Sequence, residues 1–202
     1  MKKDPFKLGI MGGTFNPIHH GHLAAAEFVR EEFKLDEILF VPSGKPPHKH
    51  KSDIASPEHR WTMTLLATGT NKCFSVSSVE IDRRGKSYTG DTILELKEIY
   101  GARSDCYFIT GADAIAEIST WHKSGNLSEL AKFIAVSRPG YKLDMSKIDP
   151  RFHRCTYLVE VPALAISSTE IRERIRRGKT IKYLVPEIVE KYIYKNKLYQ
   201  GV

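Results

Sequence analysis

The chain has 202 residues, of which 41% are hydrophobic and 27% are charged, a balance typical of a globular protein with one substantial core. No apolar run approaches the ~20 residues that a membrane-spanning helix needs, so we expect no membrane partner. The formal net charge of +7 indicates anionic partners, and we favour phosphorylated small molecules over nucleic acid because base-stacking aromatics do not alternate with the basic residues.

The first motif joins an expected strand to an expected helix. Residues 7–11 form an apolar run typical of a buried strand, residues 23–33 have the composition of a helix, and Gly12-Gly13-Thr14-Phe15-Asn16-Pro17-Ile18-His19-His20-Gly21-His22 lies between them. Glycines let the backbone approach a ligand, and the N–H groups at a helix start attract phosphate. If the helix begins near His20, the imidazoles of His19 and His22 share one face. This junction suits a triphosphate; the alternatives are a structural turn and a metal site, and no Cys or acidic cluster nearby completes a zinc set.

The next part of the chain predicts a strand, a basic loop and a helix. Residues 37–41 indicate a second strand, and residues 45–51 form a basic loop in which Pro46 and Pro47 exclude helix and inner strand. This loop is either solvated or a lid that supplies cations. Ser56 and Pro57 predict the N-cap and first residue of a helix, and residues 74–81 predict a third strand with an irregular step at the two serines.

Two further loops follow expected strands or precede expected helices. Residues 85–92 lead into a helix over residues 93–100, where Thr89 or Asp91 could be a simple N-cap. Residues 106–110 predict a fourth strand that ends in Gly111 and Asp113, and an acid in this place suits ribose hydroxyls in doubly wound folds. Trp121, between short helical pieces, is either a core residue or a ring for stacking, and residues 133–136 predict a fifth strand.

The C-terminal part supplies a second candidate phosphate site. Residues 156–161 predict a sixth strand, and residues 166–172 follow it. Ser167 and Glu170 have the spacing of a capping box, a common structural device, but hydroxyls at a helix start one turn from Arg172 also form a phosphate cradle. A last helix is expected from Pro186 to about Asn196.

Strands alternate with helices along the chain, which predicts a single α/β domain over residues 1–202, Rossmann-like and doubly wound, with a mainly parallel sheet. Ligands of such sheets bind at the carboxyl edge, where the candidate pieces would meet. Cys73, Cys106 and Cys155 are odd in number and far apart, so we expect buried free thiols. Together with the absence of a signal-peptide core, they predict a cytoplasmic protein.

The candidate residues favour direct nucleotidyl transfer. The sequence has no Walker P-loop and no credible pairing of a nucleophile with a base. In the remaining chemistry, a substrate phosphate attacks the α-phosphate of ATP in line and pyrophosphate leaves, with catalysis by positioning and charge stabilisation. His19 and His22 would hold the α- and β-phosphates, Arg172 and Lys45 or Lys49 would neutralise leaving charge, and Mg²⁺ would accompany ATP.

The motifs together carry a family resemblance. Residues 12–22 and 166–172 resemble the paired signatures of the His-x-Gly-His nucleotidyltransferase superfamily, and the whole chain resembles the bacterial nicotinate-nucleotide adenylyltransferases, which make deamido-NAD from ATP and nicotinate mononucleotide. Further matches are residues 46–49, 87–92, 111–113, 121 and 183–186.

The resemblance assigns a role to each matched residue, without a protein ligand for a metal. The implied catalytic residues are His19, His22 and Arg172. The implied ATP-binding residues are Gly12, Gly13, Thr14, Phe15, Gly21, Gly111, Asp113, Ile166, Ser167, Ser168 and Thr169. The implied nicotinate-mononucleotide-binding residues are Lys45, Lys49, Tyr88, Thr89 and Trp121, where Trp121 would stack on the pyridine ring and the backbone near Tyr88 and Thr89 would bind the carboxylate.

Two departures and several alternatives accompany this resemblance. Asn16 stands where the family usually has Asp, which removes a charge, and Gly90 replaces an apolar residue, which would loosen its loop. The alternatives are a nicotinamide-mononucleotide or phosphopantetheine adenylyltransferase, a nucleic-acid-binding module and a nucleotide-binding regulator without turnover. The sequence leaves association into homo-oligomers open.

Overall fold

The computed structural model describes residues 5–45, 54–101, 104–121, 126–137, 140, 144, 148–162 and 164–200. Its centre is a six-stranded sheet in which every neighbouring pair is parallel. The strands are β1 (Lys7–Gly13), β2 (Glu37–Pro42), β3 (Phe74–Val76), β4 (Asp105–Gly111), β5 (Lys132–Ser137) and β6 (Thr156–Glu160). The predicted Rossmann-like α/β class with a parallel sheet is confirmed.

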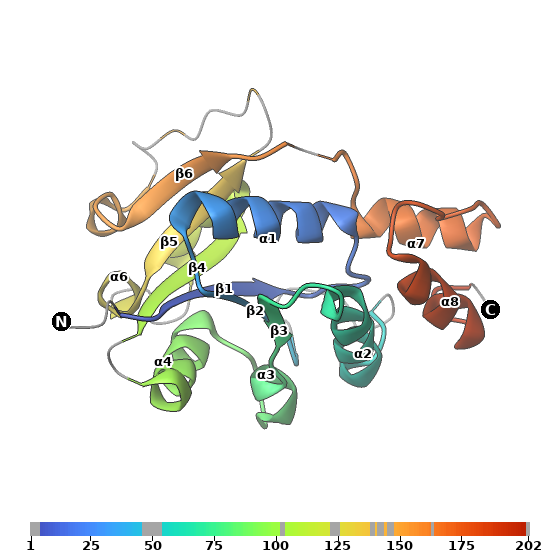
Figure 1. Cartoon of the computed structure of the whole chain (residues 1–202), viewed down its shortest axis with the longest axis horizontal. Coiled ribbons are helices and arrows are strands. Elements are labelled where there is room, and N and C mark those ends of the chain that lie inside the picture. Colours follow the sequence, from blue (N-terminus) through green and yellow to red (C-terminus); the bar gives the residue numbers. More distant parts are fainter. Residues whose placement is uncertain are drawn as a thin grey trace.

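Helices cover both faces of this sheet (Figure 1). The α-helices are α1 (His20–Phe33), α2 (Pro57–Thr68), α3 (Val79–Asp82), α4 (Thr89–Tyr100), α5 (Ala112–Ala116), α6 (Leu127–Leu130), α7 (Ser168–Arg176) and α8 (Glu187–Lys195). Two short 3₁₀ helices, η2 (Ile118–Thr120) and η5 (Pro150–Phe152), complete the described elements. None of the helices in the described part of the chain is both long and apolar enough to cross a membrane.

The strand order β3-β2-β1-β4-β5-β6 places β1 and β4 side by side at the middle of the sheet. From β1 the chain proceeds outward to β2 and β3, then returns to β4 and proceeds outward on the other side. Connections on the two sides leave a crevice at the carboxyl ends of β1 and β4, which is where open α/β sheets bind ligands. The topology therefore fixes the position of the site before any side chain is considered.

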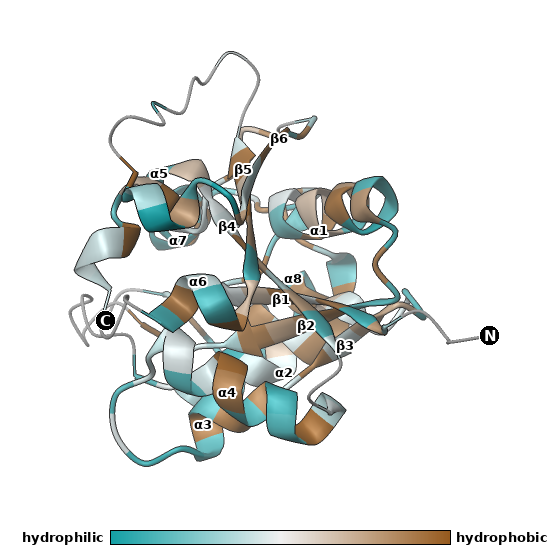
Figure 2. Cartoon of the chain, turned by 90° about the vertical axis from the view of Figure 1, so that its left-hand side faces the viewer, coloured by the Kyte–Doolittle hydropathy of each residue, from teal (hydrophilic) through white to brown (hydrophobic). Residues whose placement is uncertain are grey.

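Alternation along the strands gives the sheet two hydrophobic cores. Leu8 and Ile10 of β1 are fully buried in the core that includes α4, α5 and α6. Met11 faces the other core, which includes α1, α2, α7 and α8. Figure 2 shows the apolar strands lying between helices that carry both polar and apolar segments. Strands buried on both faces are expected for an all-parallel sheet.

The predicted third strand over residues 74–81 is wrong beyond Val76, because β3 ends there and residues 79–82 form the helix α3. The two serines cause this change. Ser77 accepts a hydrogen bond from the backbone N–H of Val79 at 3.2 Å, and Ser78 donates to the Asp82 carboxylate at 2.6 Å. Such local bonds satisfy the polar groups of a helical turn and compete with strand pairing.

Three smaller expectations also differ from the structure. Helix α4 begins at Thr89 and its N-cap is Tyr88, so neither Thr89 nor Asp91 is the cap. Gly90 therefore lies in a helix, where an added Cβ would be 3.2 Å from Leu127 of α6. All three cysteines are free, but only Cys106 is buried, because Cys73 and Cys155 lie where strands begin near the surface.

Candidate active site

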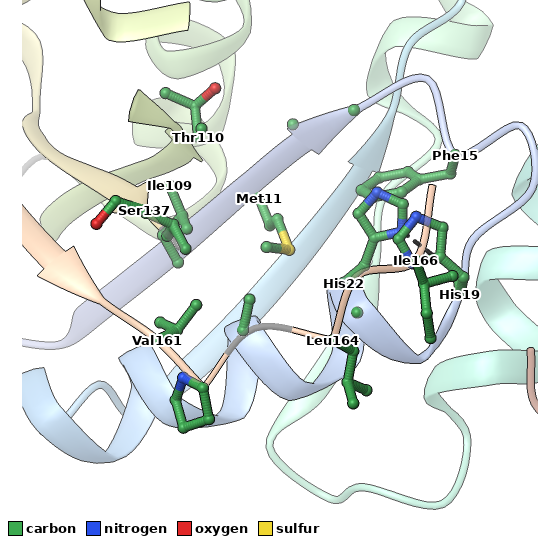
Figure 3. A pocket seen from close by; sticks show the side chains of 17 residues that line it. Met11, Phe15, His19, His22, Ile109, Thr110, Ser137, Val161, Leu164 and Ile166 are labelled. Carbon is green, nitrogen blue, oxygen red and sulfur yellow. Dashed lines mark hydrogen bonds between the residues drawn. The ribbon is translucent and has the colours of Figure 1, made fainter. Parts of the chain in front are cut away.

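A pocket of about 320 Å³ lies at the carboxyl ends of β1 and β4, as the strand order requires (Figure 3). Eight of the residues with predicted roles contribute to its lining. These are Gly12, Gly13, Phe15, His19, Gly21, His22, Gly111 and Ile166. The pocket therefore joins the first motif, the end of β4 and the segment before α7, three pieces far apart in the sequence.

His19 and His22 form a stacked pair at the start of α1. His19 is the N-cap of the helix and its ring centroid lies 3.7 Å from that of His22, with an interplanar angle of 28°. The backbone N–H of His19 donates to Nδ1 of His22 at 3.3 Å. Because Nδ1 accepts this bond, the neutral imidazole of His22 carries its proton on Nε2, where it can donate to a phosphate oxygen.

His19 is held neutral by its surroundings. Its side chain is only 6% exposed, and burial, followed by the neighbouring charge of His20, lowers the pKa of His19 to about 4. Its Nδ1 is buried and has no hydrogen-bond partner among the described residues. At neutral pH the stacked pair can thus offer imidazole N–H donors without the repulsion of two adjacent cations.

The loop between β1 and α1 is shaped around these rings. Phe15 adopts a left-handed φ of 46°, and its ring meets the ring of His22 edge-on with centroids 5.2 Å apart. A Cβ at Gly13 would lie 2.9 Å from the Phe15 ring, and a Cβ at Gly21 would lie 3.0 Å from Nδ1 of His19. A side chain at either position would therefore force the neighbouring ring to shift.

Helix α7 is fastened to the same loop. Arg172 donates from Nη1 to the carbonyl of Asn16 at 3.0 Å, and Ser168 donates from Oγ to the carbonyl of Pro17 at 2.8 Å. Ser167 caps α7 by accepting from the backbone N–H of Glu170 at 3.1 Å, which confirms half of the expected capping box. We call residues 14–19, between β1 and α1, the histidine loop. Arg172 lies beside this loop, although it is not part of the pocket lining.

The remaining predicted ATP-binding residues lie near the pocket without lining it. The carbonyl of Thr14 accepts from Nη1 of Arg60 at 2.9 Å. Asp113 is exposed in the first turn of α5, directly after Gly111, and Thr169 is exposed in the first turn of α7.

Four of the residues expected to bind nicotinate mononucleotide belong to the described part of the chain, and they lie on neighbouring elements outside the pocket lining. Lys45 is exposed after β2, and Tyr88 and Thr89 form the N-terminus of α4. Trp121 follows η2, half-buried, and its ring meets Phe108 edge-on with centroids 5.9 Å apart. Phe108 would also meet a Cβ at Gly12, so it connects Trp121 to the end of β1. Lys49 lies outside the described residues.

Sequence reasoning missed nine of the residues that line the pocket and also Arg60, which holds the loop beside it. The missed lining residues are Met11, Ala25, Ile109, Thr110, Val136, Ser137, Val161, Pro162 and Leu164. The expected strand ends could have identified those of β4 and β5. Arg60 had no such signal: it is 1% exposed and its guanidinium donates to the carbonyls of Ala55, Thr14 and Gly44 at 3.0, 2.9 and 3.1 Å.

The donors at the pocket suit an anion better than a protein-bound cation. In the part of the chain that the structure describes, no three His, Cys, Asp or Glu side chains gather into a group that could hold a metal ion. Instead, imidazoles and the N-terminus of α1 meet at the end of β1, and the dipole of a helix favours negative charge at its N-terminus.

Comparisons with known proteins agree with this geometry. The cytidylyltransferase-like family model matches residues 10–174. The chain is 54% identical over 199 residues to a probable nicotinate-nucleotide adenylyltransferase of Thermoanaerobacter sp. (strain X514), with 96% of this chain and 94% of the relative covered. It is 52% identical over 202 residues to the protein of the same description from Moorella thermoacetica, with 97% and 93% covered.

The fold has solved counterparts. The structure of Plasmodium falciparum nicotinic acid mononucleotide adenylyltransferase complexed with NaAD matches with a TM-score of 0.80 and 24% identity, covering 96% of this chain and 97% of that one. The same enzyme complexed with APC matches with a TM-score of 0.77 at 24% identity and 96% coverage of both chains. At this identity the likeness concerns the fold.

Proposed function

The chain belongs to the nicotinate-nucleotide adenylyltransferase family, and from that premise we propose that it condenses ATP with nicotinate mononucleotide to give deamido-NAD and pyrophosphate. The observation that carries this proposal is the stacked pair of His19 and His22 at the start of α1, opening onto the pocket over β1 and β4. A neutral His19 beside the Nε2 donor of His22 at a helix N-terminus suits a polyphosphate, and the crevice of a doubly wound sheet suits a nucleotide.

The reaction proceeds by displacement at phosphorus. A phosphate oxygen of nicotinate mononucleotide attacks the α-phosphorus of ATP, and the bond from that phosphorus to the bridging oxygen breaks as pyrophosphate leaves with the electron pair. His22 donates from Nε2 to a phosphate oxygen, and Arg172 neutralises charge on the leaving group. These groups act by placing donors where negative charge develops, with no covalent enzyme intermediate.

Mg²⁺ is proposed to enter with ATP as part of the substrate. Mg²⁺ commonly binds substrate phosphates and water with few protein ligands. This agrees with a pocket whose donors are imidazole and backbone groups. The ion would lower the negative charge of the triphosphate that the residues of this loop must offset.

The test is pyrophosphate release from ATP and Mg²⁺, with nicotinate mononucleotide and nicotinamide mononucleotide supplied separately. We expect rapid release with the first and slow release with the second. Equal release would keep the reaction and remove the carboxylate preference. No release with either acceptor would contradict the proposal, and phosphopantetheine would be the next acceptor to supply.

A further inference from the structure

The buried side chain of Asn16 connects three distant parts of the chain. Asn16 is 3% exposed and lies three residues before His19. Its Oδ1 accepts hydrogen bonds from the backbone N–H of Ala55 at 3.0 Å and from the hydroxyl of Tyr199 at 2.8 Å. Its backbone carbonyl accepts from Nη1 of Arg172 at 3.0 Å. One residue thus joins the C-terminal segment, the start of α2 and helix α7.

Tyr199 is held in this position by its tertiary contact. It follows α8 with a left-handed φ of 62°, a conformation that a bulky residue adopts only when its surroundings enforce it. Burial raises the pKa of the Tyr199 hydroxyl, against the lowering effect of Arg172 and Arg60. The hydroxyl is therefore protonated at neutral pH and serves as the donor to Asn16.

The contacts around Asn16 fix the histidine loop on both sides. Arg60 donates to the carbonyls of Thr14 and Ala55, so Ala55 is held by Asn16 through its N–H and by Arg60 through its carbonyl. Arg172 reaches the same loop from α7. Movement of Asn16 would displace Arg172 and the loop that carries His19, and small misplacements of catalytic groups are costly.

We propose that Tyr199 is a positioning residue for nucleotidyl transfer: by donating to Asn16, it aligns the histidine loop and Arg172 with the reacting phosphates. This rests on the proposed function, because the reaction supplies the readout. The C-terminal segment thereby becomes part of the active-site architecture, although Tyr199 itself does not line the pocket.

The test is the Tyr199→Phe substitution, which removes one hydroxyl and retains the ring. We expect kcat to fall about tenfold, equivalent to about 1.4 kcal/mol, while the KM values for ATP and nicotinate mononucleotide change less than about twofold. A change confined to the transition state is the signature of lost alignment, because lost uniform binding would raise KM alone.

Tyr192→Phe is the matched control. The hydroxyl of Tyr192 also lies 2.8 Å from its partner, Nδ1 of His59, and this bond links α8 to α2 without reaching Asn16. We expect Tyr192→Phe to retain the wild-type kcat. Equal losses in the two variants would assign Tyr199 to general anchoring of the C-terminal segment and would overturn the proposal.

A double-mutant cycle with Asn16→Ala tests whether Tyr199 acts on the active site through Asn16. If Tyr199 acts through Asn16, the double variant has the kcat of Asn16→Ala alone, whereas multiplied losses would refute this route. If Asn16→Ala does not fold, the comparison of Tyr199→Phe with Tyr192→Phe still decides whether Tyr199 is a positioning residue or a general anchor. Active wild-type enzyme with unchanged Tyr199→Phe kinetics would reject only this inference, whereas inactive wild-type enzyme would reject the proposed function.

Discussion

At the scale of single residues, the first motif depends on two imidazoles that stack at the N-terminus of α1. His19 is the N-cap of α1, and its backbone N–H fixes the tautomer of His22 by donating to Nδ1 of that ring. Gly21 has no Cβ, which leaves room for the neighbouring ring of His19. The local backbone therefore sets the orientation and the proton position of the imidazole that faces phosphate.

Replacement of His22 by Ala tests its catalytic role. We expect turnover to fall by about 10²–10³, the usual cost of losing one donor that stabilises developing charge. The fold should persist, because His22 is half-buried and the apolar core beneath it is unchanged. The measurements are steady-state pyrophosphate release and thermal unfolding. Near-normal turnover in a folded variant would remove His22 from the mechanism.

The residues that support the site from other elements could not be predicted from the sequence. The sequence motifs identify His19, His22 and the segment before α7, since their types and spacing have a chemical meaning. Nothing local distinguishes Arg60 or Tyr199 from solvated residues. Their roles arise from bonds to Thr14 and Asn16, 46 and 183 positions away, and only the folded chain brings these together.

At the scale of elements, α7 serves both as a buttress for the loop and as a candidate phosphate site. Its first residues are tied to Pro17 and Asn16, and Ser167 caps its N-terminus. The capping pattern made this helix predictable. The end of β3 was not, because alternating residues 74–81 satisfy the strand pattern equally well and tertiary pairing with β2 stops at Val76.

Ser167→Ala separates the two uses of α7. We expect it to lower the free energy of unfolding by about 1 kcal/mol, the usual cost of an N-cap, and also to raise the KM for ATP. Ser56→Ala is the matched control, because Ser56 caps α2 by accepting from the backbone N–H of His59. That variant should lose stability alone. Unchanged ATP kinetics in Ser167→Ala would leave its hydroxyl a purely structural cap.

At the scale of the whole molecule, the doubly wound topology followed from alternation of strands and helices, and the order of strands placed the pocket. Three expectations stay predictions: that residues 1–202 form one domain, that the protein is cytoplasmic and that copies of it associate. The pH dependence of stability is also a property of the whole fold, because it compares proton binding by the folded and unfolded chains.

Acidification should destabilise the protein partly through His19. Its pKa is about 4 when folded and 6.5 in the unfolded reference, so the unfolded chain binds more protons and stability is lost as pH falls below 6.5. Between pH 7 and pH 5 the expected loss is about 2 kcal/mol. Denaturant unfolding of wild type and His19→Gln at both pH values measures it. Parallel losses in the two proteins would contradict this origin.

The guanidinium of Arg60 bears on how the protein tolerates a change in the length of the chain between Gly44 and Ala55. Gly44 and Ala55 both present their carbonyls to it, so the two ends of the intervening segment converge on one buried side chain that also grips Thr14. Loop-closure entropy grows only slowly with length when the ends are fixed together. A change in the length of this segment should therefore act on the proposed substrate contacts of Lys45 and Lys49 and leave the pocket over β1 and β4 in place.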